Sequence, residues 1–167
     1  MELSIVGQQF DVIIHCAAVS DYLAEGIYAP APGAAFDPLT ATWSPHAAML
    51  NRGARGKVKS DDPELWLRLI RAPKLIDRIR RDWNWKGILV KFKLEVEKSD
   101  DELLQIAERS RRHSQADLMV ANTLEESAEW AFLGPIDGSY EKITREDLPR
   151  RLFEQIGRCR VAEAPHG

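Results

Sequence analysis

Side chains that could do chemistry follow the first apolar run of the sequence. The octet HCAAVSDY (15–22) comes directly after FDVII and brings two alanines and an aspartate together. Small side chains at Ala17 and Ala18 would let a ligand approach the backbone closely, and the carboxylate of Asp21 could bind a hydroxyl, an amine or a Mg²⁺-bound water. The same residues would also suit a structural role, in which the alanines pack under a helix and Asp21 caps a turn.

A second candidate is the lysine pair of KVKS (57–60). Lys57 and Lys59 lie two residues apart, so in an extended segment both ammonium groups point to one side, as binding of a triphosphate requires. A solvated basic turn is the alternative, because surface lysine pairs are common. The tetrapeptide alone does not decide between the two.

Two further candidates stand near the ends of apolar runs. Phe92 belongs to FKLE (92–95), in which Lys93 and Glu95 are expected on the other side of a strand, and its ring could stack on a base or fill the core. Asn122 in VANT has amide groups suited to a base edge or a phosphate, although asparagine after a strand is also an ordinary turn former.

The elements that must position these residues alternate between strands and helices. Continuous apolar runs and capping signals predict strands at 10–19, 65–70, 87–96, 116–123 and 128–134 and helices beginning near 73, 99 and 144. The strand at 10–19 is expected to be covered on both faces, and the strand at 128–134 to lie at an edge. This alternation predicts an α/β fold with parallel pairing and right-handed crossovers. Ligands of such sheets bind outside the carboxyl ends of the strands, where the candidate residues fall.

The segment between the first two strands has a different composition. Residues 23–56 are rich in Ala, Pro and Gly and keep neither a helical nor a strand period. We therefore expect a single domain over 1–167 in which 23–56 is a long flexible loop. Residues 29–56 of this loop are expected to be a mobile lid that orders only with ligand and brings Lys57 to the site.

Composition excludes several classes of function. The 167 residues are 44% apolar with a net charge of −3, which gives no basic field for nucleic acid. No apolar stretch approaches the roughly 18 residues of a membrane span and no signal peptide is visible, so we expect a cytoplasmic protein. Cys16 and Cys159 form no metal-binding or disulfide pattern, and no metal ligand set is predicted. Cys16 is expected to be a buried strand residue, and His15 a hydrogen-bonded core residue.

An ordered set of motifs resembles the phosphopantothenate–cysteine ligases of coenzyme A biosynthesis over about residues 10–125. The motifs are DVIIHCAAVSDY, KVKS, APKLIDRI, KFKLE and DLMVANT. The resemblance implies a Rossmann-like fold. It also implies an activity in which ATP or CTP, with Mg²⁺, activates the carboxylate of 4′-phosphopantothenate before the amine of cysteine attacks it.

The resemblance also assigns roles to the candidate residues. Lys57 would be the catalytic lysine and Asp21 would act beside it, and five positions would bind the nucleotide: Ala17, Ala18, Lys59, Phe92 and Asn122. KVKS and FKLE place the chain nearer the eukaryotic branch of the family. Ser110 and Ser114 stand where bacterial members that use CTP carry lysines, which favours ATP.

The family's glycine-rich N-terminal segment has no counterpart in this sequence. A homodimer, or a complex with a chain that supplies the N-terminal half, is therefore expected. The sheet gives a second reason, because the strand at 10–19 would lie at an edge that needs a partner.

Two other interpretations were weighed. A short-chain dehydrogenase or epimerase needs a Tyr-x-x-x-Lys pair. In this sequence the three tyrosines are instead followed four residues later by Gly26, Pro32 and Thr144. A non-catalytic nucleotide-binding or regulatory subunit of the same fold stays open.

Overall fold

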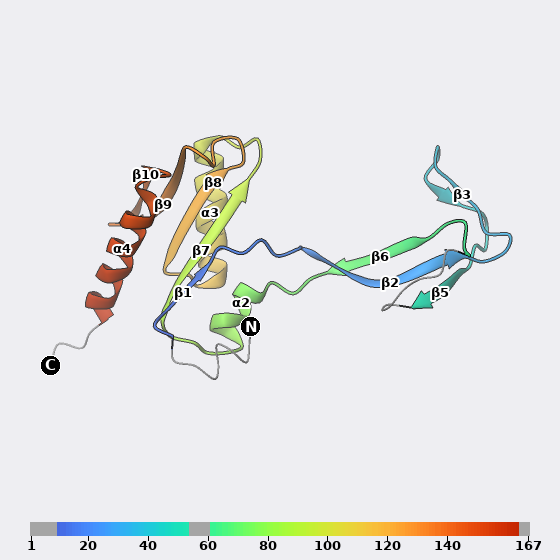
Figure 1. Cartoon of the computed structure of the whole chain (residues 1–167), viewed down its shortest axis with the longest axis horizontal. Coiled ribbons are helices and arrows are strands. Elements are labelled where there is room, and N and C mark those ends of the chain that lie inside the picture. Colours follow the sequence, from blue (N-terminus) through green and yellow to red (C-terminus); the bar gives the residue numbers. More distant parts are fainter. Residues whose placement is uncertain (1–9, 54–60, 164–167) are drawn as a thin grey trace. The chain divides into compact units, whose positions relative to one another are not determined.

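The structure is a computed structural model that describes residues 10–53 and 61–163 (Figure 1). Contacts between Cα atoms divide the chain into two compact units. The first comprises Met1–Ala17 and Lys74–Gly167, and the second comprises Ala18–Pro73. Each is described by itself below.

The first unit is built on a five-stranded sheet. Its order is β1 (Val12–His15), β7 (Ile88–Glu95), β8 (Leu118–Thr123), β9 (Trp130–Ile136) and β10 (Ser139–Thr144). β1, β7 and β8 are parallel, whereas β9 and β10 are antiparallel to their neighbours. The central strands are buried on both faces, which explains why their sequences are continuous apolar runs.

Three helices flank this sheet: α2 (Leu75–Arg81), α3 (Asp100–Ser114) and α4 (Leu148–Glu163). The predicted capping box of α3 is present, since the Ser99 hydroxyl accepts from the backbone N–H of Glu102 and the Glu102 carboxylate accepts from the backbone N–H of Ser99. Before α4, the hydroxyl of Thr144 accepts from the backbone N–H of Asp147. Within the described ranges, no helix is both long and apolar enough to cross a membrane.

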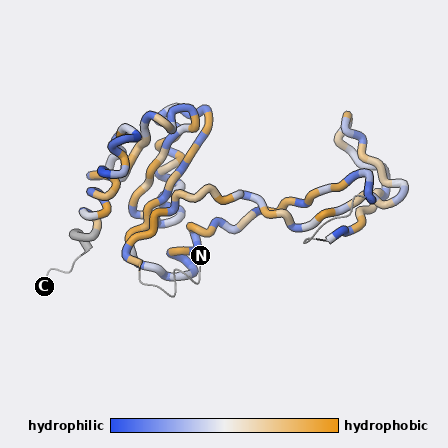
Figure 2. The backbone as a smooth tube through the Cα atoms, in the orientation of Figure 1, coloured by the Kyte–Doolittle hydropathy of each residue, from blue (hydrophilic) through white to orange (hydrophobic). Residues whose placement is uncertain are grey.

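The helices cover opposite faces of the sheet. One face packs against α4, where Val90 and Val120 meet Leu152 in one buried cluster. The other packs against α2 and α3, where Leu89 meets Ile79, and Met119 meets Leu103 in two further clusters. Figure 2 shows apolar residues along the strands of this sheet. The two faces of β7 and β8 therefore carry different helices, and alternate residues of each strand reach one or the other.

Strand β1 differs from its prediction. It is shorter than the expected 10–19, and it lies at an edge of the sheet among the described strands, as predicted. It is not fully covered, because Ile14 is 38% exposed. The prediction that Cys16 is buried is wrong: the strand ends at His15 and Cys16 is exposed.

Strands β9 and β10, at the other end of the sheet from β1, also differ from the prediction. β9 lies between β8 and β10, so the predicted edge position is wrong, and β10 was not predicted. The connecting turn has positive φ at Asp137 (49°) and Gly138 (86°), the backbone of a type I′ hairpin that an Asp-Gly pair favours. Parallel pairing was therefore predicted correctly for β1, β7 and β8 only.

The described residues of the second unit contain four strands where the sequence predicted a loop over 23–56, whereas the strand predicted at 65–70 is present as β6 (Trp66–Arg71). β2 (Tyr22–Pro30) pairs with β5 (Met49–Gly53) and with β6, and β3 (Phe36–Asp37) pairs with β4 (Thr42–Trp43). All these pairs are antiparallel. Register shifts within β2 break the alternation of its side chains, which hid the strand from a search for period two. Whether this unit acts as a lid stays a prediction.

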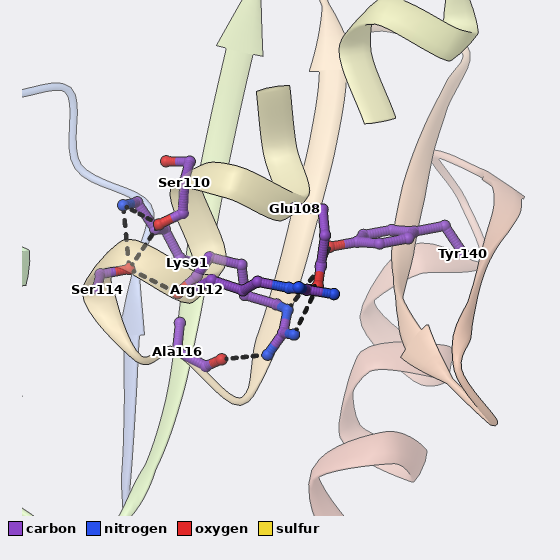
Figure 3. Close-up of polar contacts among 8 residues, drawn as sticks. Lys91, Glu108, Ser110, Arg112, Ser114, Ala116 and Tyr140 are labelled. Atoms are coloured by element: carbon purple, nitrogen blue, oxygen red, sulfur yellow. Dashed lines mark hydrogen bonds and ion pairs between the residues drawn. The ribbon is translucent and has the colours of Figure 1, made fainter. Parts of the chain in front are cut away.

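Hydrogen bonds to Glu108 connect α3 to β10 in the first unit (Figure 3). Its carboxylate accepts hydrogen bonds from Arg111 (2.8 Å, twice), from Arg112 (2.6 Å) and from the hydroxyl of Tyr140 (2.8 Å). Hydrogen bonds from Arg111, chiefly, lower the pKa of Glu108 from 4.5 to about 2. A carboxyl whose pKa is lower in the folded state adds stability above its unfolded value and loses it as the pH falls.

We therefore expect Glu108→Gln to remove the pH-dependent part of this stabilisation. The free energy of unfolding in urea should differ most between variant and parent at pH 7. The difference should shrink as the pH falls from 4.5 towards 2, because the parent then loses the same contribution. Glu146→Gln, on the exposed turn before α4, is the matched control. A constant difference between pH 7 and pH 3 would contradict this role.

Candidate functional site

The parallel strands end along one edge of the sheet of the first unit. β1 ends at His15, which lies opposite Lys91, and β7 and β8 end at Glu95 and Thr123, which lie opposite each other. Ligands of open α/β sheets bind at this carboxyl edge. The residues at and just after these strand ends therefore form the candidate site.

Phe92 and Asn122 are brought to the same part of this edge. They lie on adjacent strands, and Asn122 pairs with Leu94, two residues beyond Phe92. Phe92 packs against the buried cluster under α4 and is partly exposed. In the described part of the chain the side-chain amide of Asn122, which is half-buried, makes no hydrogen bond. Its donor and acceptor are thus available to a ligand.

The alanines and Asp21 follow β1 as expected. Ala17 ends the N-terminal segment of the first unit, whereas Ala18 and Asp21 open the second, and all three are exposed. The backbone carbonyl of Asp21 accepts from the N–H of Ala72, which closes the base of the β2–β6 pair. Its carboxylate makes no hydrogen bond or ion pair within the described ranges. The predicted lysines Lys57 and Lys59 lie outside the described residues.

The opposite face of β7 carries a buried lysine that the sequence analysis did not single out. Lys91 is 8% exposed, and its ammonium donates to the carbonyl of Ser110 (3.0 Å) and the hydroxyl of Ser114 (3.1 Å) on α3 (Figure 3). Asp77 of α2 lies 4.0 Å away and also contacts His113 at 3.3 Å. Burial lowers the pKa of Lys91, and the nearby carboxylate of Asp77 opposes that shift.

The contacts of Lys91 assign it to structure rather than to ligand binding. An ammonium group has three N–H donors, two of which are bound to α3 while Asp77 supplies the nearest counter-charge. Lys93, further along the same face, forms an ion pair with Glu95 at 2.7 Å. This ion pair confirms the expectation that Lys93 and Glu95 share one side of the strand.

Two buried polar atoms at this edge have no partner in the described part of the chain. They are Nε2 of His15 and Oγ1 of Thr123. A buried polar group without a hydrogen bond costs free energy, so such atoms mark places where a ligand or water can bind. His15 is thus not the fully hydrogen-bonded core residue that was predicted. The sequence signal for Thr123 was its place at the end of the DLMVANT run.

The fold and its carboxyl edge define a Rossmann-like α/β protein, as the sequence predicted. No family model matches the chain. It is 29% identical over 161 residues to the coenzyme A biosynthesis bifunctional protein CoaBC of Thermococcus kodakarensis. That alignment covers 93% of this chain and 33% of the relative.

Two solved structures share the fold. The DNA/pantothenate metabolism flavoprotein from Streptococcus pneumoniae has a TM-score of 0.68 at 28% identity, over 94% of this chain and 66% of that one. The C-terminal domain of a coenzyme A biosynthesis bifunctional protein CoaBC has a TM-score of 0.58 at 17% identity, over 97% and 62%, and supports the fold alone.

The chain is therefore a homologue of part of CoaBC, which bears out the resemblance to proteins of coenzyme A biosynthesis that the sequence motifs indicated. It spans about a third of the length of CoaBC and about two thirds of the flavoprotein chain. Its place nearer the eukaryotic branch stays a prediction.

Proposed function

We propose that this chain carries the nucleotide-binding part of a phosphopantothenate–cysteine ligase, which condenses 4′-phosphopantothenate with cysteine through an acyl-nucleotide intermediate. The observation that carries the proposal is the alignment of nearly the whole chain with the bifunctional CoaBC protein. The flavoprotein of similar fold, at a comparable identity, supports the same assignment.

The proposed nucleotide site lies along the carboxyl edge. Phe92 offers a partly exposed ring to the base, and Asn122 offers an amide that is unpaired within the described ranges. The sequence resemblance adds Ala17 and Ala18, whose small side chains would let the nucleotide approach the backbone, and Lys59, which would bind its phosphates.

Asp21 is the proposed contact to Mg²⁺. The described residues contain no group of three His, Cys, Asp or Glu side chains that could hold a metal. Proteins often bind Mg²⁺ through one or two carboxylates together with the phosphates of the substrate, so the single carboxylate of Asp21 would suffice. The ion would neutralise negative charge on the phosphates during attack.

The proposed chemistry has two steps. A carboxylate oxygen of 4′-phosphopantothenate attacks the α-phosphorus and pyrophosphate leaves. The amine of cysteine then attacks the acyl carbon, loses a proton, and displaces the nucleoside monophosphate. The ammonium of Lys57 would stabilise the charge that builds up on the α-phosphate. ATP is the proposed nucleotide, because the resemblance places Ser110 and Ser114 where bacterial members that use CTP carry lysines. In the structure the carbonyl of Ser110 and the hydroxyl of Ser114 accept hydrogen bonds from Lys91.

The proposal is tested by pyrophosphate release with ATP or CTP, 4′-phosphopantothenate and cysteine. The chain is assayed alone and with a polypeptide that corresponds to the rest of the flavoprotein relative. We expect turnover with ATP in the complemented mixture. Calorimetric binding of ATP without turnover in either mixture would favour a non-catalytic nucleotide-binding subunit, and absence of both would contradict the proposal.

Asn122→Ala is expected to weaken ATP binding about tenfold, because a hydrogen bond to a charged phosphate is lost. The free energy of unfolding should change little, since the amide has no partner in the described part of the chain. Calorimetry with ATP measures the first effect and urea unfolding the second. Asn122→Asp keeps the shape and adds a negative charge, so it should bind ATP less tightly than the alanine variant. Unchanged affinity in both variants would remove Asn122 from the site.

A further inference from the structure

A cavity of about 550 Å³ lies between α3 and the β9–β10 hairpin of the first unit. Its volume is within the usual range of small-molecule sites, about 300–1,000 Å³. Pro135, one residue beyond the Gly134–Met119 pair, and Gly138 of the hairpin turn line it. The cavity therefore lies at the amino-terminal end of β8, the end of the strand opposite Asn122.

One wall of the cavity is apolar, and its aromatic ring is fixed by a hydrogen bond and by packing on the strand. Leu104, Pro135 and the ring of Tyr140 supply it. The hydroxyl of Tyr140 donates to Glu108 at 2.8 Å, and a Cβ built on Gly134 would lie 2.7 Å from the ring. Only glycine at that position lets the ring pack on the strand. A flat, fixed aromatic surface of this kind favours an apolar or aromatic ligand body.

The polar wall is basic. Arg109 and Arg112 project from α3, and Arg109 has no hydrogen bond or ion pair with any described residue. Arg112 uses Nε to bind Glu108, and its terminal nitrogens have no other hydrogen bond in the described ranges. The charge of Glu108 is already balanced, because its two oxygens accept from two arginines and a tyrosine. The cavity thus presents unused guanidinium donors beside an apolar surface.

We propose that this cavity binds a small organic anion, with its carboxylate or phosphate on Arg109 and Arg112 and a flat apolar body against Leu104, Pro135 and Tyr140. Guanidinium groups match such oxyanions in geometry as well as charge. Hydrogen bonds from Arg111 lower the pKa of Glu108 to about 2, and burial raises the pKa of Tyr140, so the wall keeps one charge state near neutral pH. The proposal does not depend on the ligase activity.

Phenyl phosphate is the test probe, followed by amide chemical shifts of the full chain at constant ionic strength. Eleven heavy atoms at ordinary ligand efficiency give a dissociation constant on the order of 1 mM. We expect saturable shifts at Gln105 and Gly138, and much weaker binding of inorganic phosphate, which lacks the ring, and of benzyl alcohol, which lacks the charge. Equal affinity for either of those two probes, or no saturation by phenyl phosphate, would overturn the proposal.

Arg109→Gln should weaken phenyl phosphate about tenfold, and Arg109→Lys should recover part of the affinity because it keeps the charge. Arg145→Gln, on the exposed turn after β10, is the matched control and should bind like the parent. Chemical shifts elsewhere in the spectrum verify that each variant is folded. Equal binding by the Arg109→Gln variant and the parent would show that the cavity is not an anion site.

Discussion

Lys57→Gln is expected to lower the rate of phosphopantothenoylcysteine formation by about 10²–10³-fold, with ATP and substrates saturating. A single charged donor that acts on the transition state is worth about that factor, since it stabilises charge absent from the bound substrates. The free energy of unfolding should stay within about 0.5 kcal/mol of the parent, because this lysine is assigned to catalysis rather than to the fold. Pyrophosphate release by the complemented enzyme and urea unfolding measure the two effects.

The control for this prediction is Lys86→Gln, which removes an exposed lysine just before β7 and should leave the rate unchanged. Lys57→Arg keeps the charge but changes its geometry, so an intermediate rate is expected. Lys59→Gln should act mainly on nucleotide affinity, because this lysine is assigned to binding. Parallel losses of stability and rate in the Lys57→Gln variant would mean that the lysine supports the fold instead.

The elements predicted correctly are those whose sequence signals are local. β7 and β8 are buried on both faces, so each is a continuous apolar run between polar residues. α3 carries both halves of its capping box within four residues. Phe92 and Asn122 were placed correctly at one edge because parallel strands end together.

Strands β2 and β5 of the second unit were not predicted, because their sequences show no steady alternation between buried and exposed residues. All five residues of β5 are exposed, and register shifts interrupt the pattern of β2. The strand predicted at 65–70 is present as β6, although its Leu67 and Leu69 are exposed. An alternation of apolar and polar residues arises when one face of a strand is buried and the other is exposed to solvent. Without that contrast the strands carry little pattern, and the prolines and glycines around them resemble a loop.

The contacts of the buried Lys91 were not predicted, because its partners come from distant segments of the chain. Lys91 is a single charge inside an apolar run, and its partners Ser114 and Asp77 belong to two different helices. No spacing pattern in the sequence indicates that these three residues meet. The β9–β10 hairpin, which was not predicted, does have a local sequence signal, the Asp137–Gly138 pair.

The second large effect concerns the buried pair of Asp77 and Lys91. We expect Asp77→Ala to lower the free energy of unfolding by about 3 kcal/mol, because it leaves the ammonium of Lys91 buried without a counter-charge. Lys91→Met should cost less. Asp77 retains contact with the exposed His113, and a methionine side chain fills the same space without a charge to desolvate.

The double variant should be about as stable as Lys91→Met alone, since the buried charge that makes Asp77→Ala costly is then absent. The interaction energy of this cycle, from urea unfolding at pH 7, should therefore have a magnitude of about 3 kcal/mol. Additive effects would show that the 4.0 Å contact contributes nothing to stability.

The pH dependence of Asp77→Ala gives an independent check on the cause. Burial already lowers the pKa of Lys91 below 10.5, and loss of Asp77 removes the opposing charge, so the pKa falls further. A lysine whose pKa is lower in the folded state destabilises it while the pH is below that value, and the penalty disappears as the pH rises towards 10.5. The deficit of Asp77→Ala relative to the parent should therefore narrow between pH 7 and pH 10, whereas that of Lys91→Met should not narrow. A deficit that is constant over this range in the Asp77→Ala variant would assign its cost to lost packing or helix capping rather than to an unpaired ammonium.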